Sequence, residues 1–207
     1  MRKRAIWTVL GLLFTLSMAT PGRAQAPGQG QGRGGGQPPT TGKPMPPNLP
    51  GNFTFIPKAA QDALLKAIID GAPQDQSVRM VDTPSGHLGA YVLHWEPRTP
   101  APGTPANAFY HSDITELYYV LRGSGTILLG GELAKATEGD PNGRAVKEVS
   151  GPTANGTMAG RYTTQKIAAG DVFIVPPGVP HAMGYEVTTP LEILRVVIDP
   201  KRVLPIK

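Results

Sequence analysis

A histidine that follows a rigid turn is the residue of this sequence best suited to chemistry. Residues 170–181 read Gly-Asp-Val-Phe-Ile-Val-Pro-Pro-Gly-Val-Pro-His, so the apolar run 172–175 leads into three prolines and a glycine. Proline holds φ at about −65° and glycine accepts a positive φ, so this turn delivers His181 in one orientation. Coordination tolerates little angular error. His181 is therefore a candidate metal ligand.

Three further histidines, His87, His94 and His111, could supply a second imidazole. The chain contains no cysteine, which excludes disulfides, thiolate metal sites and cysteine nucleophiles. His94 lies in an apolar run and is interpreted as a structural or rim residue, with replacement of a missing ligand as the alternative. His111 opens the segment His-Ser-Asp-Ile-Thr-Glu-Leu-Tyr-Tyr-Val-Leu-Arg-Gly.

A carboxylate in that segment is expected to face the core. Side chains of a strand alternate between its two faces, which places Glu116 on the same face as Tyr118 and Val120. A buried carboxylate needs a cation or hydrogen bonds. Glu116 is therefore a second candidate for a charged site.

At these residues the sequence resembles the cupin superfamily. The second cupin motif runs Gly, five residues, Pro, one residue, Gly, two residues, His, three residues, Asn. The motif positions present here are Gly170, Pro176, Gly178 and His181, with Tyr185 in place of the asparagine.

The first cupin motif is incomplete. It runs His, one residue, His, three or four residues, Glu, six residues, Gly. His111, Glu116 and Gly123 match its last three positions, and Phe109 stands where the first histidine is expected. The resemblance implies an all-β double-stranded β-helix, or jelly-roll barrel, with a metal inside.

The ligands that the resemblance implies are His111, Glu116 and His181. Two imidazoles and a carboxylate suit a divalent Fe, Mn, Zn or Ni ion and leave coordination positions open. Phe109 removes one family ligand, which either weakens the site or opens it further.

A second assignment of the metal ligands, a facial triad, is also consistent with the sequence. His111-Ser-Asp113 with the distant His181 resembles the facial triad of 2-oxoglutarate-dependent oxygenases, in which Arg195 would bind a co-substrate carboxylate. It ranks lower because it leaves Glu116 unexplained.

Two tyrosines are the candidate catalytic residues. Tyr118 and Tyr185 could donate a hydrogen bond or a proton to a substrate; the alternative is that they fill the barrel. For Arg195, pairing with Glu192 or Glu186 is expected, and facing the cavity is the alternative.

The elements that position these residues are mostly short strands. Apolar residues at helical spacing predict one helix over residues 57–70, which Gly71 and Pro73 end. Strands are expected at residues 77–81, 88–95, 108–111, 117–121, 126–129, 161–168, 172–175, 181–187 and 191–198. Residues 123–125, Gly-Ser-Gly, predict a turn, and residues 139–160 a surface loop with at most a short strand.

The N-terminal segment is typical of a signal peptide. A basic start at residues 2–4 precedes the apolar residues 5–19, and cleavage is expected after Ala24, with Ala26 as the alternative. The alternative is a retained membrane anchor. Residues 25–51 are rich in Gly, Gln and Pro and predict a disordered linker, so the cupin domain is expected over residues 52–207.

Charge excludes one class of partner. The chain has 20 Lys and Arg against 15 Asp and Glu. Removal of residues 1–24 takes away four basic residues and no acidic ones, which leaves 16 against 15. A net charge of +1 without a basic cluster predicts no nucleic-acid binding.

The sequence thus predicts a secreted or periplasmic protein with no membrane association after cleavage. The first hypothesis is a metal-dependent enzyme acting on a small organic molecule, and the resemblance implies oxygenase, isomerase or decarboxylase chemistry. The alternative is a non-catalytic module that binds a sugar or another small molecule. The resemblance also implies a homodimer.

Overall fold

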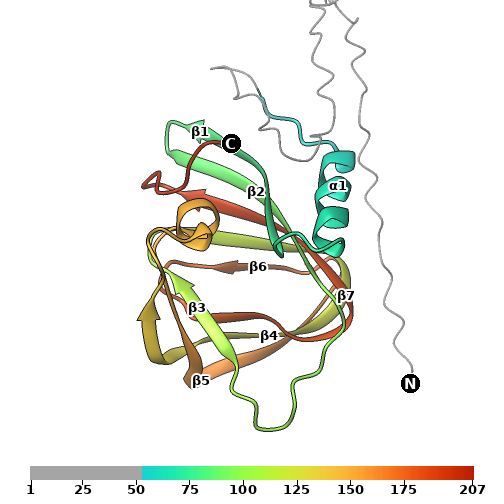
Figure 1. Ribbon diagram of the computed structural model, residues 1–207, viewed down its shortest axis with the longest axis vertical. Coiled ribbons are helices and arrows are strands. Elements are labelled where there is room, and N and C mark those ends of the chain that lie inside the picture. Colours follow the sequence, from blue (N-terminus) through green and yellow to red (C-terminus); the bar gives the residue numbers. More distant parts are fainter. Residues whose placement is uncertain (1–52) are drawn as a thin grey trace, which may run out of the picture. The chain divides into compact units, whose positions relative to one another are not determined.

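The computed structural model describes residues 53–207. The predicted signal peptide, residues 1–24, and the predicted linker, residues 25–51, lie outside them. Among the described residues, none of the helices combines the length and the apolar character needed to cross a membrane. The described elements (Figure 1) are α1 (Lys58–Ile69), β1 (Asp75–Thr83), β2 (Gly86–Trp95), β3 (Asn107–His111), β4 (Thr115–Glu138), η1 (Ala145–Ser150), β5 (Thr153–Ala168), β6 (Val172–Val175) and β7 (His181–Asp199).

Antiparallel pairing joins all seven described strands. Their order is β1-β2-β7-β3-β5-β4-β6, and β7 also pairs with β4. The pairings of β7 with β3, β3 with β5, β5 with β4 and β4 with β7 thus connect four strands in a circuit. The predicted all-β jelly roll with one N-terminal helix is confirmed.

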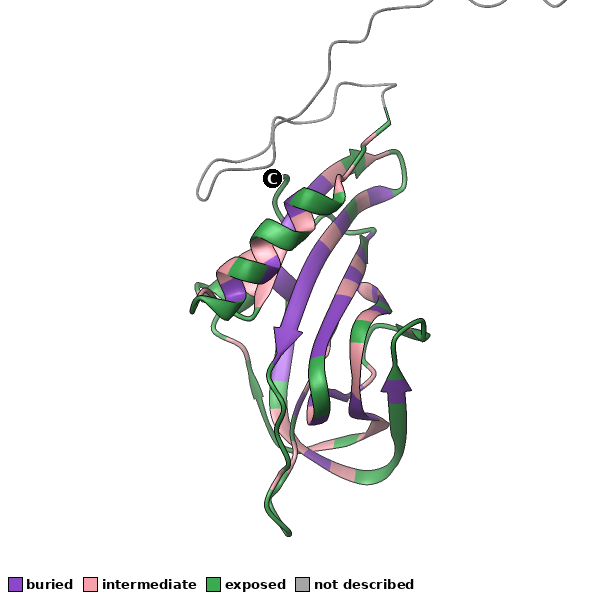
Figure 2. Ribbon diagram, turned by 90° about the vertical axis from the view of Figure 1, so that its right-hand side faces the viewer, coloured by how far each residue is buried: buried purple, intermediate pink, exposed green. Residues whose placement is uncertain are grey.

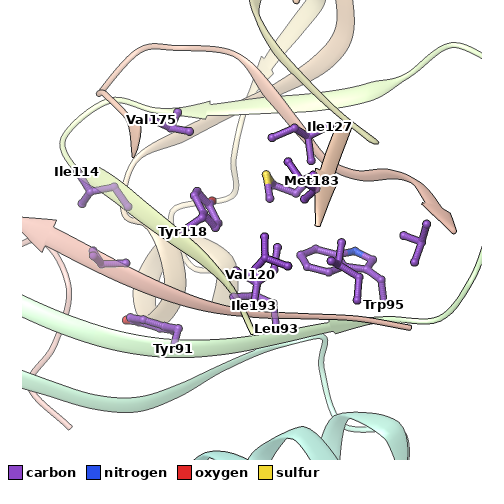
Figure 3. Packing of buried hydrophobic residues seen from close by; sticks show 14 of the residues in the cluster. Tyr91, Leu93, Trp95, Ile114, Tyr118, Val120, Ile127, Val175, Met183 and Ile193 are labelled. Atoms are coloured by element: carbon purple, nitrogen blue, oxygen red, sulfur yellow. The ribbon is translucent and has the colours of Figure 1, made fainter. Parts of the chain in front are cut away.

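The main core lies inside this arrangement of strands. Side chains from β2, β4 and β7 converge there, as Figure 3 shows for Leu93, Trp95, Tyr118, Met183 and Ile193. Each of these five side chains is at most 7% exposed. Burial on this scale is the main force that closes strands around a central space.

The helix covers part of the outer face of the sheet. The predicted helix over residues 57–70 is confirmed as α1, whose Ala60, Leu65 and Ile68 pack on Val78 of β1 and Val92 of β2. Figure 2 shows buried residues on one side of the helix and exposed residues on the other. This amphipathic pattern is the helical periodicity seen in the sequence.

The predicted turn at residues 123–125 is wrong, because β4 runs through it. Gly123 has φ 82°, and the pairing of β4 with β7 shifts register on both sides of it. A Cβ at Gly123 would lie 2.0 Å from the carbonyl oxygen of Pro190. The glycine therefore permits a bulge and a close approach between two bent strands, not a chain reversal.

The predicted loop at residues 139–160 is also partly wrong. It contains the short π-helical turn η1 and the first half of β5, which pairs with β3 and with the end of β4. These residues carry no local apolar alternation, so pairing with distant strands determines their conformation.

Candidate metal centre

Three buried side chains from three strands meet at one point in the barrel. His111 ends β3, Glu116 lies near the start of β4, and His181 begins β7. They are 4%, 1% and 0% exposed. Nε2 of His111 lies 3.5 Å from Oε1 of Glu116, and Nε2 of His181 lies 3.2 Å from its Oε2. One ligand atom from each residue can be chosen so that all three lie within 4.8 Å of one another.

The tautomer of His111 follows from its neighbours. Its Nδ1 lies 2.8 Å from Oγ1 of Thr153, and that hydroxyl donates its own hydrogen to the carbonyl oxygen of Gly151 at 2.9 Å. Thr153 can therefore only accept, so Nδ1 of His111 carries the hydrogen. Burial lowers the pKa of His111 to about 3, even though the charge of Glu116 favours the protonated ring. Its Nε2 thus carries a free lone pair.

His181 is held in the same way. Its Nδ1 lies 2.9 Å from the carbonyl oxygen of Val179, which can only accept a hydrogen. Nε2 of His181 and Nε2 of His111 are both buried and have no hydrogen-bond partner. With the hydrogen on Nδ1, the neutral form of each ring offers Nε2 as a lone pair toward the carboxylate of Glu116.

The carboxylate of Glu116 is fixed by two donors. The hydroxyl of Tyr118 donates to Oε2, and Nη1 of Arg195 donates to Oε1, both at 2.8 Å. Burial alone would raise the pKa of Glu116. The positive charge of Arg195 acts against burial and holds this pKa well below its usual range. Glu116 is therefore ionised at neutral pH.

This donor set fits a divalent cation. Lone pairs and a negative charge in a buried space repel one another unless a proton or a metal ion lies between them. Metal bonds of about 2.0–2.2 Å place neighbouring ligand atoms about 3–3.5 Å apart, close to the two measured separations from Glu116. The hydrogen bonds at Nδ1 are the outer contacts that orient metal-binding histidines.

Phe109 lies beside the cluster and adds no ligand to it. Its ring centroid is 4.5 Å from that of His181 and 5.2 Å from that of His111. It pairs with His181 in the register of β3 and β7. An apolar ring at this place closes one side of the site and leaves three protein ligands.

A cavity of about 690 Å³ reaches the cluster through His111. Sites for small organic molecules span about 300–1,000 Å³, so this space is large enough for a substrate. Tyr118 and Arg195 lie in its wall. Apolar side chains make up another part of the wall, among them Leu93, Trp95, Phe109, Val149 and Met183.

Arg195 has other partners than the sequence predicted. It does not pair with Glu192 or Glu186. In addition to its contact with Glu116, Arg195 contacts Oδ2 of Asp75 through Nη2 at 3.1 Å. The same Nη2 donates to the carbonyl oxygen of Val149 at 3.0 Å. Its guanidinium carbon lies 4.4 Å from the ring centroid of Tyr91.

The roles of Asp75 and Thr153 were missed by sequence reasoning. Burial raises the pKa of Asp75 to about 6, although Arg195 acts in the opposite direction. Both residues belong to the cavity wall. Neither lies in a motif, and no local signal in the sequence identifies them.

Three candidates from the sequence, Tyr185, Asp113 and His94, lie apart from the cluster. Tyr185 lines a second cavity of about 300 Å³ and does not line the larger one. Gly184, with φ 54°, interrupts the alternation of side chains along β7 that would place Tyr185 on the same face as His181. Asp113 pairs with Lys201 and is not part of the cluster, which does not support the facial-triad assignment. His94 contacts Glu96 at 2.9 Å and is not part of the cluster.

Comparison with known proteins identifies a family. The family model described as Cupin matches residues 97–190. No match was found among curated proteins. The similar solved structures include an oxalate decarboxylase from Bacillus subtilis, 17% identical, with a TM-score of 0.33 over 55% of this chain and 22% of that chain.

Two shorter proteins are also similar in structure. BH2720 from Bacillus halodurans is 11% identical, with a TM-score of 0.40 over 73% of this chain and 86% of that chain. The cupin protein BF4112 from Bacteroides fragilis is 14% identical, with a TM-score of 0.30 over 54% and 65%. Similarities this low assign no function.

Proposed function

The chain belongs to the cupin superfamily, and we propose that it binds a divalent metal ion and acts there on a small organic molecule. The ligands would be Nε2 of His111, Nε2 of His181 and the carboxylate of Glu116. The observation that carries the proposal is that both Nε2 atoms are buried, lack a partner and face an ionised carboxylate. Fe, Mn, Zn and Ni all accept this donor set.

The residues around the ligands would keep the site ready for metal and substrate. Thr153 and the carbonyl of Val179 orient the imidazoles, and Tyr118 with Arg195 holds the carboxylate. When bound, the cation supplies Lewis acidity toward a substrate oxygen and, for a redox metal, reactivity with dioxygen. Three protein ligands leave coordination positions for substrate on the cavity side.

Tyr118 has a positioning role in this proposal. Burial raises the pKa of Tyr118 well above its usual value, so the hydroxyl keeps its hydrogen and donates it to Oε2 of Glu116. Tyr185 lines the other cavity and takes no part.

A non-catalytic binding module is the second candidate. It is favoured by one observation: the hydroxyl of Tyr118 is already engaged with Glu116, and Tyr185 lies apart. Neither expected proton donor is therefore free for substrate. Oxygen consumption or product formation in a screen of phenols, keto acids and sugars would identify an enzyme. Saturable binding without turnover would identify a binder.

Metal titration tests the proposal. Protein stripped with a chelator should take up about one divalent ion per chain, and His181→Gln or His111→Gln should lose this uptake. His94→Gln is the matched control, because His94 is a buried histidine outside the cluster. Circular dichroism checks that each variant folds. Equal uptake by wild type and by both folded ligand variants would refute the metal site.

We also propose that the protein is exported, on the basis of the basic and apolar residues 1–19 and the small residues around Ala24. Mass spectrometry of the protein recovered from the periplasm or medium should find an N-terminus at Gln25. A full-length chain in the membrane fraction would support the retained anchor instead.

A further inference from the structure

The cavity wall carries more positive than negative charge. Its basic residues are Arg98, Lys135 and Arg195, and Asp75 is its single acidic residue among the described residues. Arg195 is already neutralised, because it contacts both Asp75 and Glu116. The positive charge available to a ligand therefore belongs to Lys135 and Arg98.

Lys135 is a cavity-lining residue with an unusual backbone conformation. It is exposed, lines the cavity and has φ 54°, in the left-handed region that residues other than glycine rarely adopt. The pairing of β4 with β5 shifts register between Ala134 and Thr137, around this residue. Strained backbone of this kind is concentrated at ligand sites.

The ammonium group of Lys135 is free to bind a ligand. Within residues 53–207 it forms no ion pair or hydrogen bond.

Arg98 is the second cation, and its backbone is anchored. Its backbone N–H donates to the carbonyl oxygen of Val187, and the N–H of Val187 donates back, both at 2.9 Å. Nε of Arg98 donates to the carbonyl oxygen of Gly184 at 2.6 Å. The terminal nitrogens of its guanidinium have no partner in the described part of the chain. Arg98 lines both this cavity and the second, smaller one, and its anchored guanidinium leaves its terminal nitrogens for a ligand.

The rest of the wall suits an apolar body. Leu93, Trp95 and Met183, which are labelled in Figure 3, form one part of it, and Phe109 and Val149 also line it. A volume of about 690 Å³ exceeds the space that a two-carbon acid would need.

We propose that the cavity binds an organic carboxylate with an apolar or aromatic body, whose charged group lies against Lys135 and Arg98. The inference rests on the proposed function in taking this cavity as the substrate site, and it adds the chemical class of the substrate. A charge-assisted contact with two cations at the rim selects the anion, and the apolar wall selects the body.

Matched neutral and anionic probes test this inference. Phenylacetate and phenylacetamide differ in charge and little in shape, and calorimetry at low ionic strength compares their affinities for metal-loaded and metal-free protein. We expect wild type to prefer phenylacetate by about tenfold in the metal-free form. Lys135→Asn, which tolerates a positive φ, and Arg98→Gln should each reduce this preference to about threefold or less.

Lys166→Gln is the control, because Lys166 is an exposed lysine of β5 outside the cavity wall. It should keep the preference of wild type. Equal affinity for both probes in wild type, or an unchanged preference in both cavity variants, would overturn the inference. Failure of the metal titration with the charge preference intact would refute the metal function alone.

Discussion

Phe109 determines how many ligands the cluster offers. Its ring lies in contact distance of both imidazoles and cannot coordinate. His111 lies two residues further along the same strand, so both side chains point to the same face of β3. A histidine at position 109 would therefore direct a third imidazole toward the same space.

Phe109→His should bind a divalent metal about tenfold or more tightly than wild type, because it adds a nitrogen ligand. Competition with a chromophoric chelator measures the affinity. Phe109→Leu serves as the control, since it keeps an apolar side chain and should show no gain. Identical affinities of the two variants would mean that residue 109 does not face the ion.

Thr153 acts at the same scale through the tautomer of His111. It accepts the hydrogen of Nδ1, which leaves Nε2 free for a metal. Its own hydroxyl hydrogen is committed to the carbonyl of Gly151.

Thr153→Val should lower metal affinity about 10–100-fold, the usual effect of losing an outer contact to a ligand histidine. Competition with the chromophoric chelator measures this affinity. Thr126→Val is the matched control, because Thr126 is a buried threonine that bonds to Glu186 away from the cluster. If both variants bind metal as wild type does, Thr153 has no part in orienting His111.

At the scale of elements, the crossing of β4 and β7 shapes the barrel. β4 pairs with β6 over residues 116–119 and with β5 over residues 124–138. The bulge at Gly123 lies between these two regions, where the carbonyl of Pro190 approaches most closely. This bend brings Glu116 and His181 into one interior.

Gly123→Ala should be more destabilising than Gly170→Ala. Both glycines have positive φ, so each variant loses about 1–2 kcal/mol from backbone strain. Only at Gly123 would the new Cβ meet backbone atoms; at Gly170 nothing lies within 4 Å. We expect a further loss of about 1–3 kcal/mol at Gly123, measured by urea unfolding. Equal losses would show that the crossing adjusts without cost.

At the scale of the whole molecule, part of the outer sheet face is left uncovered by α1. Neighbouring strands place apolar side chains there, Tyr119 beside Val172 and Leu117 beside Ile174. Val172 and Ile174 are 56% and 60% exposed. Contiguous exposed apolar residues are typical of an interaction surface.

The homodimer implied by family resemblance stays a prediction, and this face is where we expect it. Light scattering with size-exclusion chromatography should give twice the chain mass for wild type. Ile174→Lys should give the monomer, because it buries a charge in the interface. Lys166→Gln should leave the dimer intact. A monomeric wild type would contradict the prediction.

Much of the fold could be predicted because its signals are local. The helix at residues 57–70 and the strand at residues 172–175 follow from periodicity and flanking turn residues. The motif that contains His181 and the segment from His111 to Glu116 likewise identify residues that the structure brings together. These segments could be recognised because they contain turns, and the conformation of a turn depends on residues that are neighbours in the sequence.

What only the tertiary structure decided are contacts between distant segments. Arg195 meets Asp75 and Glu116, and η1 supplies the carbonyl of Val149. The positive φ of Gly184 sends Tyr185 to another cavity. The sequence by itself determined the candidate ligands and where most of the strands lie along the chain. Their surroundings were decided by folding, because a bulge or a long-range ion pair depends on residues that no local pattern contains.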